Sequence, residues 1–388
     1  MWAWLKAEEY ENNPYYKGCK LVLPASDRQV QDALDQARVT ESNSYRIADL
    51  GDCGYVLKKY LNLSDCKIEE INYIARHVQQ LTEEEDHIYD EMISLKITDE
   101  VKTLPVGVFI DAFANMNKME FHPGVYDDIS LGEIALEAQM MPWMEQIPDE
   151  ALPFLSYEKI GECIRKQENG FYSQDGYYSI SVSEWEEIHN TVSLENTDRE
   201  SSIFSVEMED QEAGISLWIK LPCSEKAIEK ACLALRVEDM DAGEILSVRC
   251  FIPVLDQISY RDMIFSNLNE MAGKINRMSR EELVKYKAVL ESSECKTAGE
   301  AFSLIDMLDQ YDFCQRPINL AELGREYFIK AGIAPGKIKL QDADYAWYVE
   351  AKLNGVNMKK TRYGIVHKKM DQKQEREMEN TAMQMIFG

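Results

Sequence analysis

The stretch CKLVLPASDRQVQDALDQARV (residues 19–39) returns 198 residues later as LWIKLPCSEKAIEKACLALRV (residues 217–237). In the first copy, Ser26 and Gln29 have the spacing of a capping box before apolar residues at helical intervals. In the second copy, Ser224 caps a helix with the same spacing. Strand-like segments flank each helix, at residues 3–9, 20–24 and 45–50 in one copy and 203–208, 216–222 and 246–252 in the other. The pattern predicts a β-hairpin, a helix and a strand, written twice.

The similarity continues in the same order along the chain. The helical segment at residues 71–81 recurs at 268–278, and the capping box Thr82/Glu85 that follows it recurs as Ser279/Glu282. A second helical segment, at residues 128–138, recurs at 317–327. A hairpin segment at residues 167–180, around Gly170, recurs at 352–366, around Gly355. Alternating helices and strands can share caps and spacing without common ancestry. Four matches in order favour a tandem duplication over that alternative.

We therefore predict an α+β fold, an elongated multi-domain chain of small mixed sheet/helix modules with intervening helical bundles, internally duplicated. The expected divisions are an α/β module, a helical module and a helix-hairpin module, an acidic connector, and the same three modules again: residues 1–52, 53–150, 151–183, 184–202, 203–255, 256–335 and 336–388. The last module carries a basic segment at residues 359–376, expected to be solvated or docked on an acidic surface, with nucleic-acid contact as the alternative.

The charge of the chain is strongly uneven. The net charge is −27, but residues 1–200 hold 39 acids and 17 bases, whereas residues 201–388 hold 30 acids and 25 bases. Residues 119–158 carry nine carboxylates and residues 167–198 carry seven more, with no Lys or Arg in either stretch. Such a field repels nucleic acid and attracts basic partners, including proteins whose basic channel holds DNA.

The sequence lacks the usual signatures of enzymes and cofactor sites. It has no Walker A loop, no G-x-G-x-x-G, no H-E-x-x-H and no G-x-S-x-G. His87 and His189 each follow several acids, so a divalent cation site is one interpretation, but a solvated helix face or terminus is the favoured one. We expect no catalytic residue, no metal and no cofactor.

The nine cysteines are scattered, odd in number and without a C-x-x-C pair, so we expect buried thiols. Cys163 is predicted to be a core thiol rather than a nucleophile. No apolar run of 18 residues occurs, and the first residues lack a basic leader, so we expect a cytoplasmic protein without a membrane segment.

Three segments resemble ArdA-type antirestriction proteins from mobile elements of Gram-positive bacteria. They are the LxLP strand and helix at residues 21–37, the helix INYIARHVQQL at residues 71–81, and YEKIGECIRKQENGFYSQDGYYSI at residues 157–180. The resemblance covers residues 1–182 and, more faintly, 203–366. It implies an elongated acidic protein, usually dimeric, whose carboxylates imitate duplex phosphates in the DNA channel of type I restriction enzymes, without catalysis.

This chain departs from that family in being much longer and in having a nearly neutral second copy. The resemblance then implies either a homodimer or a single-chain pseudo-dimer whose first half is the decoy. The candidate DNA-mimicking carboxylates are Glu83, Glu84, Glu85, Asp86, Asp90, Glu91, Asp127, Asp128, Glu133, Glu137, Glu145, Asp149, Glu150, Glu158, Glu184, Glu186 and Glu187.

The expected partner is a bacterial DNA-binding defence complex. A type I restriction-modification enzyme comes first, with a CRISPR effector or another defence system as alternatives, and the acidic half is expected to bind no nucleic acid itself. An acidic adaptor that grips a basic protein without mimicking DNA is the competing interpretation. An enzyme ranks third.

Overall fold

The computed structural model describes residues 1–13, 16–97, 100–179, 185–191, 202–210, 214–317, 319–330, 340–355 and 358–369. In the first half, the helices and strands are β1 (Trp2–Ala7), β2 (Cys19–Val22), α1 (Asp27–Gln36), β3 (Tyr45–Gly51), α2 (Tyr55–Tyr60), α3 (Ile68–Val78), α4 (Glu83–Ser94), α5 (Val106–Asn115), β4 (Glu120–Pro123), α6 (Asp128–Glu137), α7 (Tyr157–Gln167), β5 (Phe171–Tyr172) and β6 (Gly176–Ser179). In the second half, they are β7 (Phe204–Asp210), β8 (Ile215–Leu221), α8 (Glu225–Leu235), β9 (Glu244–Cys250), α9 (Phe265–Asn276), α10 (Arg280–Ser293), α11 (Ala298–Asp306), β10 (Tyr311–Cys314), α12 (Leu320–Lys330), α13 (Asp342–Gly355), β11 (Met358–Lys360) and β12 (Ile365–Lys368).

The two halves repeat one order of elements and one sheet topology. The described residues form four three-stranded antiparallel sheets, with the orders β2-β1-β3 and β4-β6-β5 in the first half and β8-β7-β9 and β10-β12-β11 in the second. Where the first half has α2, the second has a single 3-10 turn, Leu255–Gln257. The α+β fold of small modules is confirmed, and the matching topologies support the duplication.

Individual residues repeat as well. Arg38 and Arg236, 198 positions apart, both end a helix in the left-handed region with φ of 62°. The buried hydroxyl of Tyr89 donates to the Phe109 carbonyl at 3.1 Å, and that of Tyr286 donates to the Ala301 carbonyl at 2.9 Å. Because these bonds join equivalent helices in each half, the repeats share packing as well as element order.

The helix caps expected from the sequence occur with one exception. Capping boxes open α1, α4 and α10 at Ser26, Thr82 and Ser279. Ser224 stands at the N-cap of α8 but its side chain makes no capping hydrogen bond. The third helical residue of α8 is Ala227, which lacks the reciprocal acceptor that Gln29 supplies in α1.

The two glycines expected at the centres of hairpins lie instead at helix ends. The β5–β6 turn spans residues 173–175 and the β11–β12 turn spans residues 361–364, whereas Gly170 follows α7 and Gly355 ends α13. A Cβ on Gly170 would lie 1.9 Å from the Tyr177 hydroxyl oxygen, so close packing requires glycine there. Glycine is common at helix ends, so in the sequence these two glycines indicated the end of a helix rather than the centre of a hairpin.

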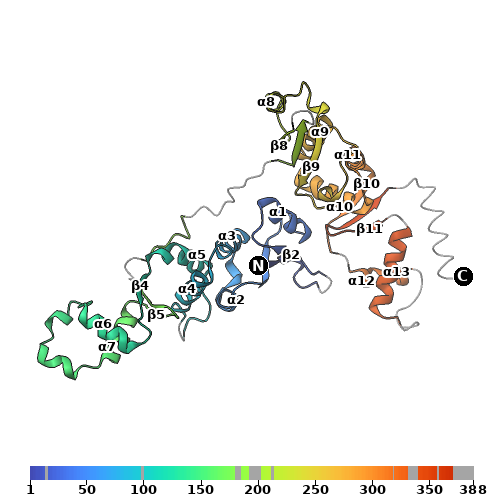
Figure 1. Cartoon of the computed structure of the whole chain (residues 1–388). Helices are drawn as coiled ribbons and strands as arrows, with labels where there is room; N and C mark the ends of the chain where they lie inside the picture. The colour runs from blue at the N-terminus through green and yellow to red at the C-terminus, as the bar shows by residue number, and fades with distance from the viewer. Residues whose placement is uncertain are drawn as a thin grey trace. The chain divides into compact units, whose positions relative to one another are not determined.

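The chain folds into two compact units. The first is Met1–Ala3, Val22–Pro24 and Ile47–Glu195, and the second is Trp4–Leu21, Ala25–Arg46 and Asn196–Gly388. The second unit therefore takes α1 from the first repeat. Neighbouring helices form close pairs inside each unit, α6 with α7 in the first and α12 with α13 in the second (Figure 1).

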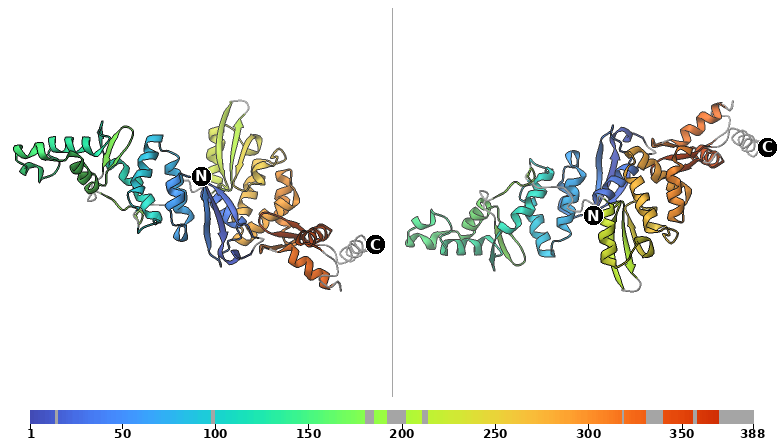
Figure 2. Two further views of the ribbon diagram at one scale, coloured as in Figure 1. Left: turned by 90° about the horizontal axis from the view of Figure 1, so that it is seen from below. Right: turned by 90° about the horizontal axis from the view of Figure 1, so that it is seen from above.

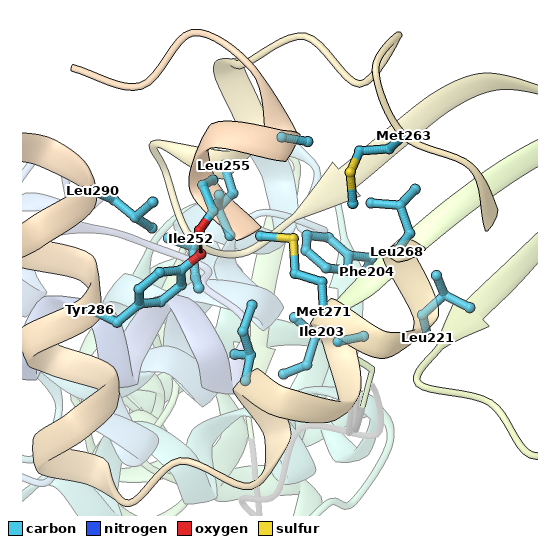
Figure 3. Close-up of a cluster of buried hydrophobic side chains, with 14 of the residues drawn as sticks. Ile203, Phe204, Leu221, Ile252, Leu255, Met263, Leu268, Met271, Tyr286 and Leu290 are labelled. Carbon is cyan, nitrogen blue, oxygen red and sulfur yellow. Dashed lines mark hydrogen bonds between the residues drawn. The ribbon is translucent and has the colours of Figure 1, made fainter. Parts of the chain in front are cut away.

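The second unit is built on one large apolar core. Phe204 from β7, Leu268 and Met271 from α9, and Tyr286 from α10 converge there (Figure 3). The same core continues to Val366 in β12 and joins the β7–β8 hairpin, drawn in yellow-green in both views of Figure 2, to the helices. In the first unit, a smaller core between α6 and α7 includes Leu131 and Ile164. None of the described helices has the length and apolarity needed to cross a bilayer.

Candidate functional site

Helix α4 carries the densest group of candidate carboxylates. Thr82 caps the helix, and the four acids that follow stabilise it at the positive end of its dipole. Glu83 to Asp86 are all exposed, whereas Asp90 and Glu91 are half-buried. Six carboxylates occur within nine residues and α4 contains no Lys or Arg. Over about 12 Å of helix this is one charge per roughly 2 Å, close to the duplex value of about one per 1.7 Å.

The ionisation of these groups follows from their surroundings. Hydrogen bonds from Thr82, first from its backbone N–H, lower the pKa of Glu85. Partial burial, followed by repulsion from Asp86 and Glu91, raises the pKa of Asp90 to about 6. The remaining acids of α4 have no cationic partner among the described residues. At neutral pH this surface is therefore strongly negative.

The sheet β4-β6-β5 connects α4 to the α6–α7 pair. The Tyr178 hydroxyl on β6 donates to the Glu84 carboxylate at 2.7 Å, and burial together with Glu84 raises the pKa of Tyr178 to about 12. The Tyr172 hydroxyl on β5 donates to the Asp128 carboxylate at 2.7 Å. Two tyrosines on adjacent strands thus fix both acidic helices to one sheet.

On α6 and α7, the candidate carboxylates separate into structural and free groups. Asp127 caps α6, and hydrogen bonds from Ser130 lower the pKa of its carboxyl. Asp128 receives a bidentate pair from Arg165 at 2.8 and 3.1 Å, which lowers the pKa of Asp128. Three further acids are exposed and make no ion pair with the described residues: Glu133, Glu137 and Glu158.

The remaining candidates lie in connecting segments. The side-chain oxygens of Asn115 and Asp111 on α5 accept hydrogen bonds from backbone N–H groups of residues 186–189, at 2.8 to 2.9 Å between nitrogen and oxygen. Glu186 pairs with Lys118 at 2.8 Å, whereas Glu187 is exposed. Glu145 lies in a short 3-10 turn and Asp149 and Glu150 in another, but their side chains are outside the described set, and Glu184 lies outside the described residues altogether.

His189 and His87 behave as ordinary side chains in the described structure. The His189 Nε2 atom lies 2.8 Å from a Glu70 carboxylate oxygen, and His87 is exposed on α4. In the described ranges, no group of three or more His, Cys, Asp or Glu is arranged to hold a metal ion.

The prediction of buried thiols is wrong for most cysteines. Of the nine, Cys19 is buried, seven are partly buried, and Cys163 is exposed. Ile160, Gly161 and Ile164 form the buried face of α7, and Cys163 lies about 100° around the helix from Ile164. Apolar spacing placed Cys163 near the core stripe, but the stripe is too narrow to include it.

Sequence reasoning missed a buried ionic cluster in the second unit. The Lys287 ammonium on α10 has no exposed side-chain surface, and it donates to the Asp32 and Asp35 carboxylates of α1 at 2.7 and 3.0 Å. The Tyr363 hydroxyl donates to Asp32 at 3.0 Å, and the Arg280 guanidinium lies 3.4 Å from Asp35. The only sequence signal was a pair of aspartates at i, i+3 beside the apolar stripe of α1.

The α6–α7 module also exposes large apolar side chains. Phe154 is 87% exposed, and Tyr126, Ile129 and Trp143 are exposed as well. Large apolar side chains that gather on a surface mark interaction sites. Here they lie in the same module as the free carboxylates of α6 and α7.

No family model, curated protein or solved structure compared with this chain matches it. Its function is therefore inferred from its own surface.

Proposed function

We propose that this protein is a non-catalytic counter-defence inhibitor that mimics DNA and occupies the DNA-binding channel of a bacterial defence complex, with a type I restriction-modification enzyme as the first target. The observation that carries the proposal is α4, whose carboxylates approach the linear charge density of a duplex without a compensating base. The proposal includes action in the cytoplasm, as a homodimer or a single-chain pseudo-dimer.

The free energy of such binding comes from counterions. Lys and Arg side chains in a DNA channel carry counterions that fixed carboxylates release on binding, so affinity falls steeply with salt. Acids already paired with a cation contribute little, which removes Asp128 and Glu186 from the effective set. The exposed acids that remain are Glu83, Glu84, Glu85, Asp86, Asp127, Glu133, Glu137, Glu158 and Glu187.

A cleavage assay with a purified type I restriction enzyme tests the proposal. The protein should inhibit DNA cleavage, excess duplex DNA should relieve the inhibition, and added salt should weaken it. A variant with four exposed acids changed to Lys should lose inhibition by on the order of 100-fold, because each reversal replaces an attraction with a repulsion. The four positions are Asp86, Glu133, Glu137 and Glu158.

The matched control reverses four exposed acids of the second unit: Glu238, Glu281, Asp309 and Glu350. Both variants change the net charge equally, so an effect of total charge alone would weaken inhibition in both. Equal loss would contradict the assignment of the site to the first unit. Inhibition that excess duplex DNA fails to relieve would contradict mimicry.

The exposed apolar side chains favour a second candidate function, an acidic adaptor that binds a basic protein without imitating DNA. Aromatic anchors commonly dominate such interfaces. Under this alternative, changing Phe154 and Trp143 to Ala should weaken capture of the partner more than the four charge reversals do. A pull-down from bacterial lysate, eluted with duplex DNA, separates the two functions because DNA displaces only a partner held in its own DNA channel.

A further inference from the structure

Within the second unit, α1 contacts the residues of the second repeat through one face. Arg28, Asp32 and Asp35 form this face, with the Arg28 guanidinium 4.4 Å from the centre of the Phe251 ring. Asp32 and Asp35 are buried and Arg28 is half-buried. On the receiving side, Lys287, Arg280 and Tyr363 surround the two aspartates. The acidic face of α1 thus docks on a basic surface formed by Lys287, Arg280 and Tyr363, which we call the receptor.

The duplication provides a second copy of this helix face, and that copy is exposed. At the offset of 198, Arg28, Asp32 and Asp35 correspond to Lys226, Lys230 and Leu233 on α8. All three are exposed, and Leu233 is 80% exposed. The face that is acidic and covered in α1 is therefore basic and open in α8.

The duplication also provides a second copy of the receptor, with its charge inverted. At the offset of 197, which aligns Tyr89 with Tyr286, Arg280 corresponds to Glu83 and Lys287 to Asp90. At the offset of 188, which aligns the β6 and β12 hairpins, Tyr363 corresponds to Asp175, an exposed residue. At the offset of 197, Phe251 corresponds to the exposed Gly54, where a Cβ would lie 3.7 Å from an Asp90 carboxylate oxygen, so glycine replaces the ring with no side chain beside Asp90.

We propose that α8 of one copy of this protein docks on the α4 acids of a second copy, through Lys226, Lys230 and Leu233 on one side and Glu83, Asp90 and Asp175 on the other. The two surfaces are different, so the contact is heterologous and repeats from copy to copy. Lys230 takes the place of Asp32, and Asp90 that of Lys287, so the pair keeps opposite charges in reversed order.

The charge inversion also excludes the wrong pairings. An α8 face with two lysines is repelled by a receptor that holds Lys287 and Arg280, and an α1 face with two aspartates is repelled by Glu83 and Asp90. A duplicated chain without this inversion has no electrostatic means of telling its two helix faces apart. Reversal at paired positions on both surfaces is the pattern expected of a specific contact.

This association goes beyond the proposed function and is tested without any target. Sedimentation velocity of the full chain at about 0.05 M salt should show assemblies that grow with concentration and that dissociate at about 0.5 M salt, where charges are screened within about 5 Å. Lys230→Glu should weaken association at least tenfold. Asp90→Lys should do the same, and the double variant should recover association because the pair is again opposite in charge.

Lys296→Glu is the matched control, since Lys296 is exposed outside the α8 face; it should associate as the unmodified protein does. Circular dichroism verifies the fold, and Asp175→Lys, in an exposed turn, replaces Asp90→Lys if that variant unfolds. The proposal is overturned if the unmodified protein stays monomeric at low salt up to about 100 μM, or if Lys230→Glu associates equally well. Either outcome leaves inhibition of DNA cleavage to be judged by its own assay.

Discussion

Lys287 is a charged side chain with no exposed surface, and its position is explained by the groups around it. Two carboxylates accept from its ammonium, and the other oxygen of each accepts from a glutamine side chain, Gln36 for Asp32 and Gln31 for Asp35. The Tyr363 hydroxyl donates to the same Asp32 oxygen that accepts from Lys287. A buried charge is tolerated only when it is paired and hydrogen-bonded in this way. The network therefore fixes α1 to α10 in one register more than it adds net stability.

Lys287→Met should destabilise the second unit by about 3 to 5 kcal/mol, because Asp32 and Asp35 lose their buried cation. Urea unfolding followed by circular dichroism measures the change. Lys285→Met, two residues earlier on a less buried side of α10, should change stability by under about 0.5 kcal/mol. Equal effects at the two positions would show that the ionic cluster has no special role.

Asp90 makes the stability of the first unit depend on pH. In the folded protein, the pKa of Asp90 is raised to about 6 from an ordinary value near 4. The free energy of folding therefore becomes less favourable as pH rises through 6. Asp90→Asn should stabilise the protein by about 1 kcal/mol at pH 7.5, since half-exposure reduces the effect through solvent screening. Below about pH 4 the gain should vanish because the carboxyl is then protonated in both states. Urea unfolding at the two pH values checks this, and a gain that persists at low pH would rule out the charge as its cause.

At the scale of elements, α6 and α7 cross unusually closely. A Cβ on Gly132 would lie 2.0 Å from the Tyr157 carbonyl oxygen, and one on Gly161 would lie 1.9 Å from the Asp128 carbonyl oxygen. The second half has the same feature, since a Cβ on Gly324 of α12 would lie 2.6 Å from the Tyr345 carbonyl oxygen on α13. Glycine at these crossings lets the helix backbones meet.

Gly132→Ala should therefore destabilise the α6–α7 module by about 1 to 3 kcal/mol, since a backbone carbonyl cannot move aside as a flexible side chain can. Gly273→Ala, within α9, is the control: apart from its chain neighbours and the backbone of its own helix, no atom lies within 4 Å of its Cβ position, so Ala should stabilise α9 by up to about 1 kcal/mol. Thermal unfolding of both variants shows whether the sign differs. A neutral Gly132→Ala would contradict the close crossing.

At the scale of the molecule, the compact units do not coincide with the sequence repeats. The second unit includes residues 25–46 of the first repeat, held by contacts such as Lys287 with Asp32 and Arg280 with the Val39 carbonyl at 2.9 Å. A duplicated chain of this kind is joined across its own repeat boundary by side chains as well as by the backbone.

A protease site engineered between residues 191 and 202 tests this joining. After cleavage, the two pieces should elute together in size-exclusion chromatography, because α1 remains docked on α10. The combined Asp32→Ala and Asp35→Ala change should let them separate, since Lys287 then loses both carboxylates. Pieces of the unmodified protein that separate on cleavage would contradict the contact.

The sequence alone predicted the order of elements, the repeat of that order and three capping boxes, because these depend on local spacing and on self-similarity within the chain. It could not distinguish Glu133, which is exposed and makes no ion pair with the described residues, from Asp128, which Arg165 neutralises from 37 residues away. Nor could it show that Asp32 and Asp35 meet Lys287 more than 250 residues along the chain. Burial and pairing of charges are properties of tertiary contacts, so only the folded structure decided which carboxylates support the fold and which remain open to a partner.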